Sequence, residues 1–322
     1  RRTERGELAE VLGSAALEQD KQHRTLGMTY VVDAELARAT PWARGALEAY
    51  ARGVNAYIAS LDSKTMPPEF QILQYKPKPW TPADSLLVGK LFAEALSNTW
   101  RLDIMRAALA ALPAEKRAGL MPEISPLDVL VVGEDSRNKS KKSGSARALP
   151  SINAGDFSSR ETVLALARDE EVAAEALARV GVYAEGLAAS NNWVVSGKRT
   201  ASGKPLLAND PHLQATAPSI WHLVHLTAPG LRVAGVTAPG SPGVIVGHND
   251  RIAWGMTNVG PDVQDLYEEK FDPNNPKRYL TPVGWRYVDV RREEIKVRKG
   301  FTDSATDTVA LDVNMTRHGP IV

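Results

Sequence analysis

The spacing of apolar residues changes near residue 190, and this change constrains the fold more than any other feature of the chain. Before residue 130, apolar side chains recur every three or four positions, which is the pattern of amphipathic helices. From Asn192 onward, short apolar runs alternate with turn-forming residues, which is typical of β-strands. The sequence therefore predicts a helical half followed by a half built of strands.

Two of the predicted helices have clear start signals. Thr40 has a side chain that can cap a helix, and Pro41 suits the first helical turn. The sequence Thr-Pro-Ala-Asp at 81–84 gives the same kind of start to a second helix. The helical patterns span 40–61, 81–96 and 102–112, and proline-containing connectors lie at 66–68 and 76–79.

A polar stretch separates the two halves. From 133 to 160 the composition shifts to Ser, Lys, Gly, Asn and Arg, and Asn138–Ser145 is its most polar part. Such a segment cannot bury enough apolar surface to order itself, so we expect a mobile linker. A helical pattern from 161 to 180 follows it.

The second half predicts a hairpin and several further strands. Thr200–Lys204 has the composition of a hairpin turn, and the apolar run at 205–208 is expected to return as a buried strand. Trp193, Trp221 and Trp254 lie in apolar runs, so we expect them to fill the core rather than to form a carbohydrate or partner surface. The predicted strands span 193–195, 205–208, 220–226, 233–237, 244–246 and 252–255.

Composition excludes some functions. Lys and Arg number 39 against 38 Asp and Glu, so the chain lacks the positive charge that would hold nucleic acid. It contains no cysteine, which excludes disulfides and thiolate chemistry. No apolar run reaches the roughly 18 residues of a membrane span. The chain has neither an initiator Met nor a visible signal peptide, and we expect both ends to be truncated.

Histidines near Asp210 raise the alternative of a metal hydrolase, because histidine is the commonest ligand of transition metals. His212, His222 and His225 would be its ligands. An odd separation along one predicted strand places His222 and His225 on opposite faces, so they cannot readily reach one ion. We expect one of the two to be a core histidine and the other a surface one. His248 is expected to be a turn residue that bonds its own backbone.

A Ser-His-Asp triad that uses His212 or His248 is a second alternative mechanism. No Gly-x-Ser-x-Gly motif surrounds any serine in the chain, so this alternative lacks its usual nucleophile turn. Ser190 lies at the boundary between the two halves, directly before an apolar run. Its position alone is a weak signal for a nucleophile, and the stronger signal comes from the neighbouring residues.

Four segments resemble motifs of the penicillin amidase family, which includes penicillin and cephalosporin acylases and N-acyl-homoserine lactone acylases. They occur in the family's order, and the resemblance covers nearly the whole chain. The first comprises Arg1-Arg2, 5–13 and Asp20, and the others are Ser-Asn-Asn-Trp-Val-Val-Ser-Gly at 190–197, Asn-Asp-Pro-His-Leu at 209–213 and Gly-His-Asn-Asp-Arg-Ile-Ala-Trp-Gly-Met-Thr-Asn at 247–258.

The resemblance implies an N-terminal nucleophile hydrolase of the α+β class, with a four-layer α/β/β/α core of stacked antiparallel sheets. Autocatalytic cleavage after Ala189 would make Ser190 an N-terminal residue, whose amine titrates near ~8 and can take the hydroxyl proton. Ser190 would then attack the amide carbonyl of a small-molecule N-acyl substrate. His212 would orient the amine or the oxyanion, and the Asn258 backbone N–H would stabilise the oxyanion. The family's other oxyanion Asn and its supporting Arg are expected beyond Val322.

The resemblance also divides the chain into parts. Residues 1–132 would form the helical small subunit, 133–189 a spacer that blocks the site until it is cut, and 190–322 the start of the large subunit. The mature protein would be an α/β heterodimer made from one precursor, exported to the periplasm or outside the cell. An uncleaved, inactive precursor fragment or a non-catalytic binding homologue is the alternative.

A structural calcium ion is a further implication of the resemblance. The resemblance implies Asp103, Asp262 and Asp265 as its ligands, and hard oxygen ligands from two segments would join the helical half to the sheets. The alternative is that they are three solvated carboxylates. The acyl and amine specificities stay open, since β-lactam, homoserine lactone and simple N-acyl amine scission need the same catalytic groups.

Overall fold

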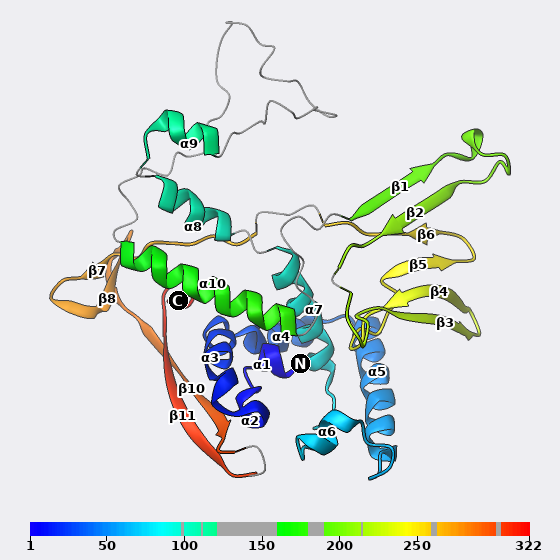
Figure 1. Cartoon of the computed structure of the whole chain (residues 1–322), viewed down its shortest axis with the longest axis horizontal. Coiled ribbons are helices and arrows are strands. Elements are labelled where there is room, and N and C mark those ends of the chain that lie inside the picture. The colour runs from blue at the N-terminus through cyan, green and yellow to red at the C-terminus, as the bar shows by residue number, and fades with distance from the viewer. Residues whose placement is uncertain are drawn as a thin grey trace, which may run out of the picture.

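The computed structural model describes residues 1–97, 100–110, 112–120, 160–179, 190–213, 215–258, 263–300 and 304–322. Its first part is helical, and strands begin directly after Ser190 (Figure 1). The helices are α1 (Arg2–Arg5), α2 (Ala9–Leu12), α3 (Leu17–Leu26), α4 (Met28–Arg38), α5 (Pro41–Ser60), α6 (Pro68–Ile72), α7 (Pro82–Leu96), α8 (Trp100–Leu109), α9 (Ala114–Leu120) and α10 (Arg160–Arg179), with 3-10 turns η1 (Gly13–Ala16) and η3 (Gly197–Arg199).

Capping fixes the starts of α5 and α7 as the sequence predicts. The Thr40 hydroxyl accepts a hydrogen bond from the Ala43 N–H at 3.2 Å. Thr81 and Asp84 form a reciprocal capping box, in which the Asp84 carboxylate accepts from the Thr81 N–H at 2.7 Å. The connector predicted at 66–68 is partly wrong, because Pro68 opens the short helix α6.

Part of the expected spacer is helical. The helix predicted at 161–180 is confirmed as α10, which packs against α3 and α8. The Gln22 side-chain amide donates to the Asp169 carbonyl oxygen at 2.7 Å, which joins α10 to α3. The rest of the predicted linker, from 133 to 159, lies outside the described residues.

The described strands form four antiparallel sheets, ordered β1-β2, β3-β4-β5-β6, β7-β8-β9 and β10-β11. Within the four-stranded sheet each strand pairs with its neighbour in the sequence. The strands are β1 (Asn191–Val195), β2 (Leu206–Asp210), β3 (His222–Ala228), β4 (Leu231–Thr237), β5 (Val246–Asn249), β6 (Ala253–Trp254), β7 (Phe271–Asp272), β8 (Asn275–Thr281), β9 (Gly284–Tyr287), β10 (Asp289–Arg298) and β11 (Thr306–Met315).

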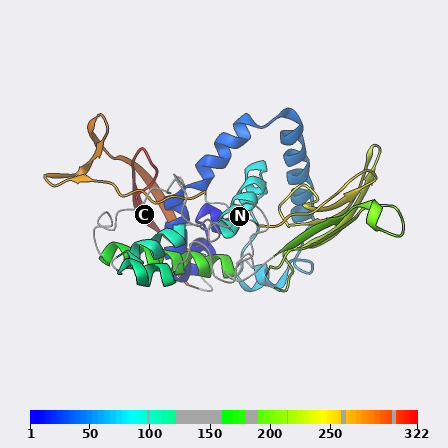
Figure 2. The same ribbon diagram turned by 90° about the horizontal axis from the view of Figure 1, so that it is seen from above.

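The helices lie between two groups of strands. Figure 1 shows β1 to β6 on one side of the helical layer and the β10-β11 hairpin on the other, and the view from above in Figure 2 shows the same separation. Strand β10 packs against α2 and α3. The long hairpin that follows the β1 to β6 region in the sequence therefore returns to the helices at the start of the chain.

The core consists of small apolar clusters between these layers. Ile295 of β10 is fully buried against Ala9 and Ala16, so one face of the hairpin closes the N-terminal helices. Val32 of α4 and Leu87 of α7 form a second cluster. Burying a side chain of this size contributes roughly 1.5–3 kcal/mol. The core of the described residues is therefore centred on the helices and on β10.

Several expectations about the strands need correction. The hairpin of β1 and β2 is confirmed, but its return strand is not buried, since Leu206 is 53% exposed. Trp193 is also 53% exposed and does not fill the core. Trp221 and Trp254 are half-buried. Alternation of residue type predicts the strands, but it does not show which faces other elements cover.

The fold class is confirmed as α+β, with a helical N-terminal half and antiparallel sheets. The stacking of two sheets into four layers stays a prediction from the resemblance. None of the helices in the described ranges has both the length and the apolar composition to cross a bilayer.

Candidate active site

Ser190 directly precedes β1, and its polar atoms are bonded by two other segments. Its hydroxyl oxygen accepts a hydrogen bond from the backbone N–H of His212 at 3.3 Å. Its carbonyl oxygen accepts from the Thr257 hydroxyl, also at 3.3 Å. The structure therefore brings together the three segments that the sequence analysis singled out after residue 189.

The β1-β2 hairpin explains why the second segment lies beside Ser190. Asn191 pairs with Asp210 in the antiparallel register, so the residues after Asp210 continue past Ser190. The Asn191 side-chain amide donates to the Asp210 carboxylate at 3.4 Å. A short apolar hairpin thus places the backbone N–H of His212 at the Ser190 hydroxyl.

Asn209 joins all three segments, a role that was not predicted from the sequence. Its side-chain NH2 donates to the carbonyl oxygens of Asn191 at 2.7 Å and Met256 at 2.9 Å. Its side-chain oxygen accepts from the Met256 N–H at 3.0 Å. A Cβ added at Gly255 would lie 2.8 Å from the Cβ of Asn209, so this contact requires a glycine. The only sequence signal for this role was that Asn209 and Gly255 both lie in motifs that resemble those of the family.

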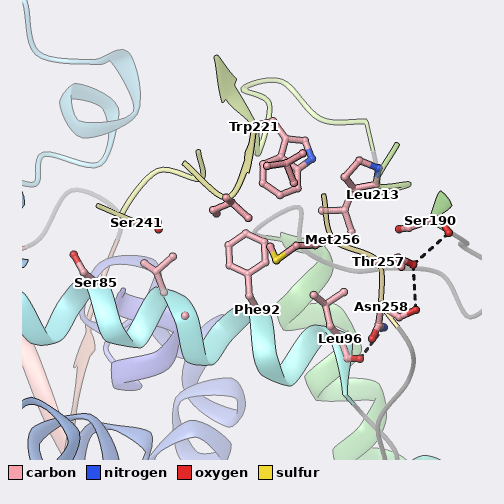
Figure 3. A pocket seen from close by; sticks show the side chains of 15 residues that line it. Ser85, Phe92, Leu96, Ser190, Leu213, Trp221, Ser241, Met256, Thr257 and Asn258 are labelled. Carbon is pink, nitrogen blue, oxygen red and sulfur yellow. Dashed lines mark hydrogen bonds between the residues drawn. The ribbon is translucent and has the colours of Figure 1, made fainter. Parts of the chain in front are cut away.

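Asn258 and Ser190 line one pocket. The Asn258 side-chain NH2 donates to the Leu96 carbonyl oxygen at 2.7 Å, near the end of α7. Figure 3 shows Ser190, Thr257 and Asn258 at one end of the pocket, with Leu96 below Asn258. The proposed role of its backbone N–H stays a prediction.

His212 contacts Ser190 through its backbone, while its ring contacts a carboxylate. The ring Nε2 lies 2.9 Å from an Asp210 side-chain oxygen. The His212 ring, together with the Asn191 amide, holds the pKa of the Asp210 carboxyl below its usual range. Both side chains are exposed, so this pair is solvated. The ring contact therefore contributes only modestly to holding the segment that carries the backbone donor.

The pocket beside Ser190 has a volume of about 410 Å³ and a mainly apolar lining. The rings of Phe92 and Trp221 stack with their centroids 6.4 Å apart. Figure 3 shows Phe92 and Leu96 extending from α7 toward Trp221 and Met256. Helix α7 supplies one wall, and the segments around β2, β3, β5 and β6 supply the other. Apolar pockets of this size suit small organic ligands.

Two expectations about histidine are wrong. His222 and His225 lie on β3 and both are exposed, so neither is a core histidine. His248 belongs to β5 and pairs with Ala253 instead of forming a turn. The turn is made by Asn249, whose side-chain oxygen accepts from two following backbone N–H groups.

The residues expected to bind calcium are only partly described. Asp103 lies on α8, and its carboxylate accepts a hydrogen bond from Arg106 at 3.0 Å. Asp265 is exposed in the segment between β6 and β7. Asp262 lies outside the described residues, and so does Ala189, the residue before the expected cleavage site. Within the described ranges, one group of three possible metal ligands occurs elsewhere, at Glu4, His23 and Glu94.

Comparisons with known proteins cover the whole chain. The family model described as penicillin amidase matches residues 1–322. The acyl-homoserine lactone acylase QuiP of Pseudomonas aeruginosa is 33% identical over 98% of this chain and 34% of its own length. Penicillin acylase 2 proenzyme of Pseudomonas sp. strain SE83 is 31% identical over 100% of the chain and 38% of its own length.

Penicillin G acylase of Escherichia coli is 26% identical over 100% of this chain and 41% of its own length. The chain thus spans less than half the length of the curated relatives it matches. A family model that matches from the first residue to the last agrees with the convergence of three motifs around Ser190. The chain belongs to the penicillin amidase family.

Proposed function

We propose that the protein is an N-acyl amide hydrolase in which Ser190 becomes an N-terminal nucleophile. The observation that carries this proposal is the position of Ser190 at one end of an apolar pocket, with a backbone N–H of His212 at its hydroxyl oxygen. Relatives that are named as acylases support the same reaction class. The reaction is hydrolysis of a linear amide bond.

The first step would be cleavage of the bond between Ala189 and Ser190. It frees an α-amino group with a pKa near ~8, which can accept the proton of the Ser190 hydroxyl directly or through one water. The hydroxyl oxygen then attacks the substrate carbonyl carbon. The proton passes to the leaving amine, and an ester forms between the acyl group and Ser190. Water attacks this ester, releases the acid and restores the hydroxyl.

Negative charge develops on the carbonyl oxygen in both steps, and it needs donors that are already in place. We assign the Asn258 backbone N–H to this role, because Asn258 lines the pocket beside Ser190. The hydrogen bond from its side chain to Leu96 fixes the residue against α7. Loss of one such donor typically costs about 3 kcal/mol of transition-state stabilisation.

The pocket lining favours an apolar acyl group. Phe92, Trp221 and Met256 face a cavity with few polar groups, so the acyl chain would lie there and the amine would point toward solvent. This arrangement fits aliphatic or aromatic acyl amides. Acyl-homoserine lactones and acylated β-lactams are the two classes that the names of the relatives suggest.

Processing would divide the chain into an α/β heterodimer. The word proenzyme in the name of one relative supports this part of the proposal. Residues 1–132 would belong to the small subunit, 133–189 to the spacer and 190–322 to the large subunit. We also propose export to the periplasm or the medium, which the family resemblance supports and cell fractionation would test.

A structural calcium ion held by Asp103, Asp262 and Asp265 is part of the same proposal. Asp103 has a mostly buried carboxylate, but Arg106 already supplies it with a positive charge. The ion would therefore bind through its other oxygen and join α8 to the segment after β6. Calcium depletion should lower the melting temperature of the complete protein, and Asp103→Asn should remove that effect.

The decisive experiment is intact mass and N-terminal sequencing of the complete protein beside a Ser190→Ala variant. We expect the wild type to yield a chain that begins at Ser190 and the variant to stay whole. Hydrolysis of N-acyl amides should accompany cleavage. If both proteins stay whole, the self-processing proposal is wrong and a non-catalytic binding role replaces it.

A further inference from the structure

A buried cluster of three side chains lies among the helices, away from Ser190. Glu4 on α1, His23 on α3 and Glu94 on α7 each direct one possible ligand atom to a common point, and these atoms lie within 4.8 Å of one another. The Glu4 and His23 side chains are 0% and 1% exposed, and that of Glu94 is 13% exposed. The cluster is therefore almost entirely buried from solvent.

Several polar atoms of this cluster lack a hydrogen-bond partner among the described residues. Both carboxylate oxygens of Glu4, one of Glu94 and the Nε2 of His23 are buried without a hydrogen-bond partner. Buried carboxylates normally accept hydrogen bonds or lie beside a cation, because an unpaired charge is very costly to remove from water. Because three neighbouring side chains all lack a partner, a cation bound between them would satisfy all three.

The tautomer of His23 supports the same reading. Its Nδ1 lies 2.9 Å from the Gln19 carbonyl oxygen, which can only accept a hydrogen bond. Nδ1 must therefore carry a hydrogen, and in the neutral ring Nε2 presents a lone pair to the two carboxylates. Metal-binding histidines commonly donate their other N–H to a backbone carbonyl in this way.

The distances within the cluster fit a shared ion better than direct hydrogen bonds. His23 Nε2 lies 3.6 Å from a Glu4 oxygen and 3.8 Å from a Glu94 oxygen. Direct hydrogen bonds between these groups would be about 2.7–3.2 Å long. Two ligands that each lie about 2.1 Å from a tetrahedral Zn²⁺ are separated by roughly 3.4 Å. Small adjustments of the side chains would accommodate the ion.

We propose that Glu4, His23 and Glu94 bind a divalent transition-metal ion, with Zn²⁺ as the best match. One imidazole nitrogen and two carboxylate oxygens form a mixed set that Zn²⁺ accepts, with water as the fourth ligand. Calcium fits poorly, because it takes six to eight oxygen ligands. This site shares no residue with the proposed calcium site.

The ion would connect three helices to the wall of the active-site pocket. Glu94 lies on α7 between Phe92, which lines the pocket, and Leu96, whose carbonyl oxygen accepts the hydrogen bond from Asn258. Metal binding would hold this end of α7 against α1 and α3. The ion has a structural role in this proposal and takes no part in amide hydrolysis, so its test does not depend on the proposed function.

The test uses the complete protein after removal of metal with a chelator. Zn²⁺ binding is measured by calorimetry, and Co²⁺ is added separately to record the visible spectrum that indicates tetrahedral ligands. We expect one tight site per chain, and a loss of affinity of about tenfold or more in His23→Gln and in Glu94→Gln. His225→Gln is the matched control, because His225 is exposed on β3.

Two results would overturn the proposal. The first is a wild-type protein that binds neither Zn²⁺ nor Co²⁺ tightly, which would show that the cluster is not a transition-metal site. The second is unchanged affinity in folded His23→Gln and Glu94→Gln variants, which would place the metal elsewhere. Circular dichroism checks that the variants are folded. Since Glu94 is partly exposed, Glu94→Gln remains a usable test if His23→Gln fails to fold.

Discussion

The side-chain NH2 of Asn258 donates to the Leu96 carbonyl oxygen at 2.7 Å. This bond joins the end of α7 in the helical half to the third motif of the β half, beside Ser190. Because helix α7 also forms one wall of the pocket, the shape of this pocket depends on contacts between residues far apart in the sequence.

Gly89 on α7 lines the pocket, and a Cβ added there meets nothing within 4 Å. Gly89→Ala should stabilise the protein by about 0.5–1 kcal/mol, since glycine is unfavourable inside a helix. Gly89→Leu should fill the pocket and lower kcat/KM for long acyl chains relative to short ones by roughly tenfold or more. Thermal unfolding and a series of acyl chain lengths measure the two effects.

Gly53 on α5 provides the matched control for that pair of variants. It also lies in a helix with nothing within 4 Å of an added Cβ, but it does not line the pocket. Gly53→Ala should stabilise the protein similarly, and Gly53→Leu should not alter the chain-length preference. An equal shift of preference at both positions would contradict the assigned acyl pocket.

Gly255→Ala should disturb the connection between the three active-site segments. The added Cβ would lie 2.8 Å from Asn209, so the Asn209 side chain must move and its bonds to Met256 must weaken. We expect a loss of about 1–3 kcal/mol in stability and slower cleavage before Ser190. Gly243→Ala is the control, because an added Cβ there has open space. Equal behaviour of both variants would refute this role of Gly255.

Asp210 should titrate at a higher pH when His212 is replaced. The ring of His212 holds the pKa of Asp210 below its usual range, so His212→Ala should move that pKa toward the ordinary value of about 3.9. The folded pKa lies below the unfolded one. The stabilisation from this pair is therefore complete above the unfolded value and is lost as pH falls through the folded value.

Carboxyl-carbon NMR titration measures this change directly. His225→Ala serves as the control, since His225 lies on β3 and should leave the Asp210 titration as in the wild type. An unchanged pKa of Asp210 in His212→Ala would show that the His212 ring does not influence this carboxyl in solution.

Glu293 on β10 is 5% exposed, and three side chains share its carboxylate. Arg24 and Arg291 each contact it at 3.0 Å, and the Tyr30 hydroxyl donates to it at 2.9 Å. Glu293→Ala would leave two guanidinium groups without their carboxylate, so we expect a loss of about 3 kcal/mol in the free energy of unfolding. Chemical denaturation measures this change.

A solvated pair on the same hairpin supplies the comparison. Arg292 and Asp312 lie 3.7 Å apart with both side chains largely exposed. Asp312→Ala should therefore change stability by less than about 1 kcal/mol. If both substitutions have equally small effects, the network around Glu293 does not stabilise the contact between β10 and the helices.

Local signals in the sequence predicted the parts of the fold that local chemistry determines. Thr40 and Thr81 each cap a helix where the sequence places a start, and the β1-β2 hairpin forms around the predicted turn. Burial was less predictable, because it depends on what other elements cover. Trp193 lies in an apolar run and is nevertheless exposed.

The candidate site was also predictable only in part from the sequence. Ser190, His212 and Asn258 were predicted from the resemblance. In the structure Ser190 and Asn258 line one pocket, and the His212 backbone N–H donates to the Ser190 hydroxyl, while their catalytic roles stay predictions. The role of Asn209 was not predicted, since its bonds reach residues of two other segments. The cluster at Glu4, His23 and Glu94 was not predicted either, because only packing of α1, α3 and α7 brings these residues together.

The β10-β11 hairpin has a consequence for synthesis on the ribosome. Ile295 packs against Ala9 and Ala16, so the apolar face of α2 and η1 is covered only after β10 has been synthesised. Contacts between residues so distant in sequence form late and slow folding. This apolar face therefore stays uncovered while the residues between Ala16 and Ile295 are synthesised, which exposes it to chaperones or to aggregation.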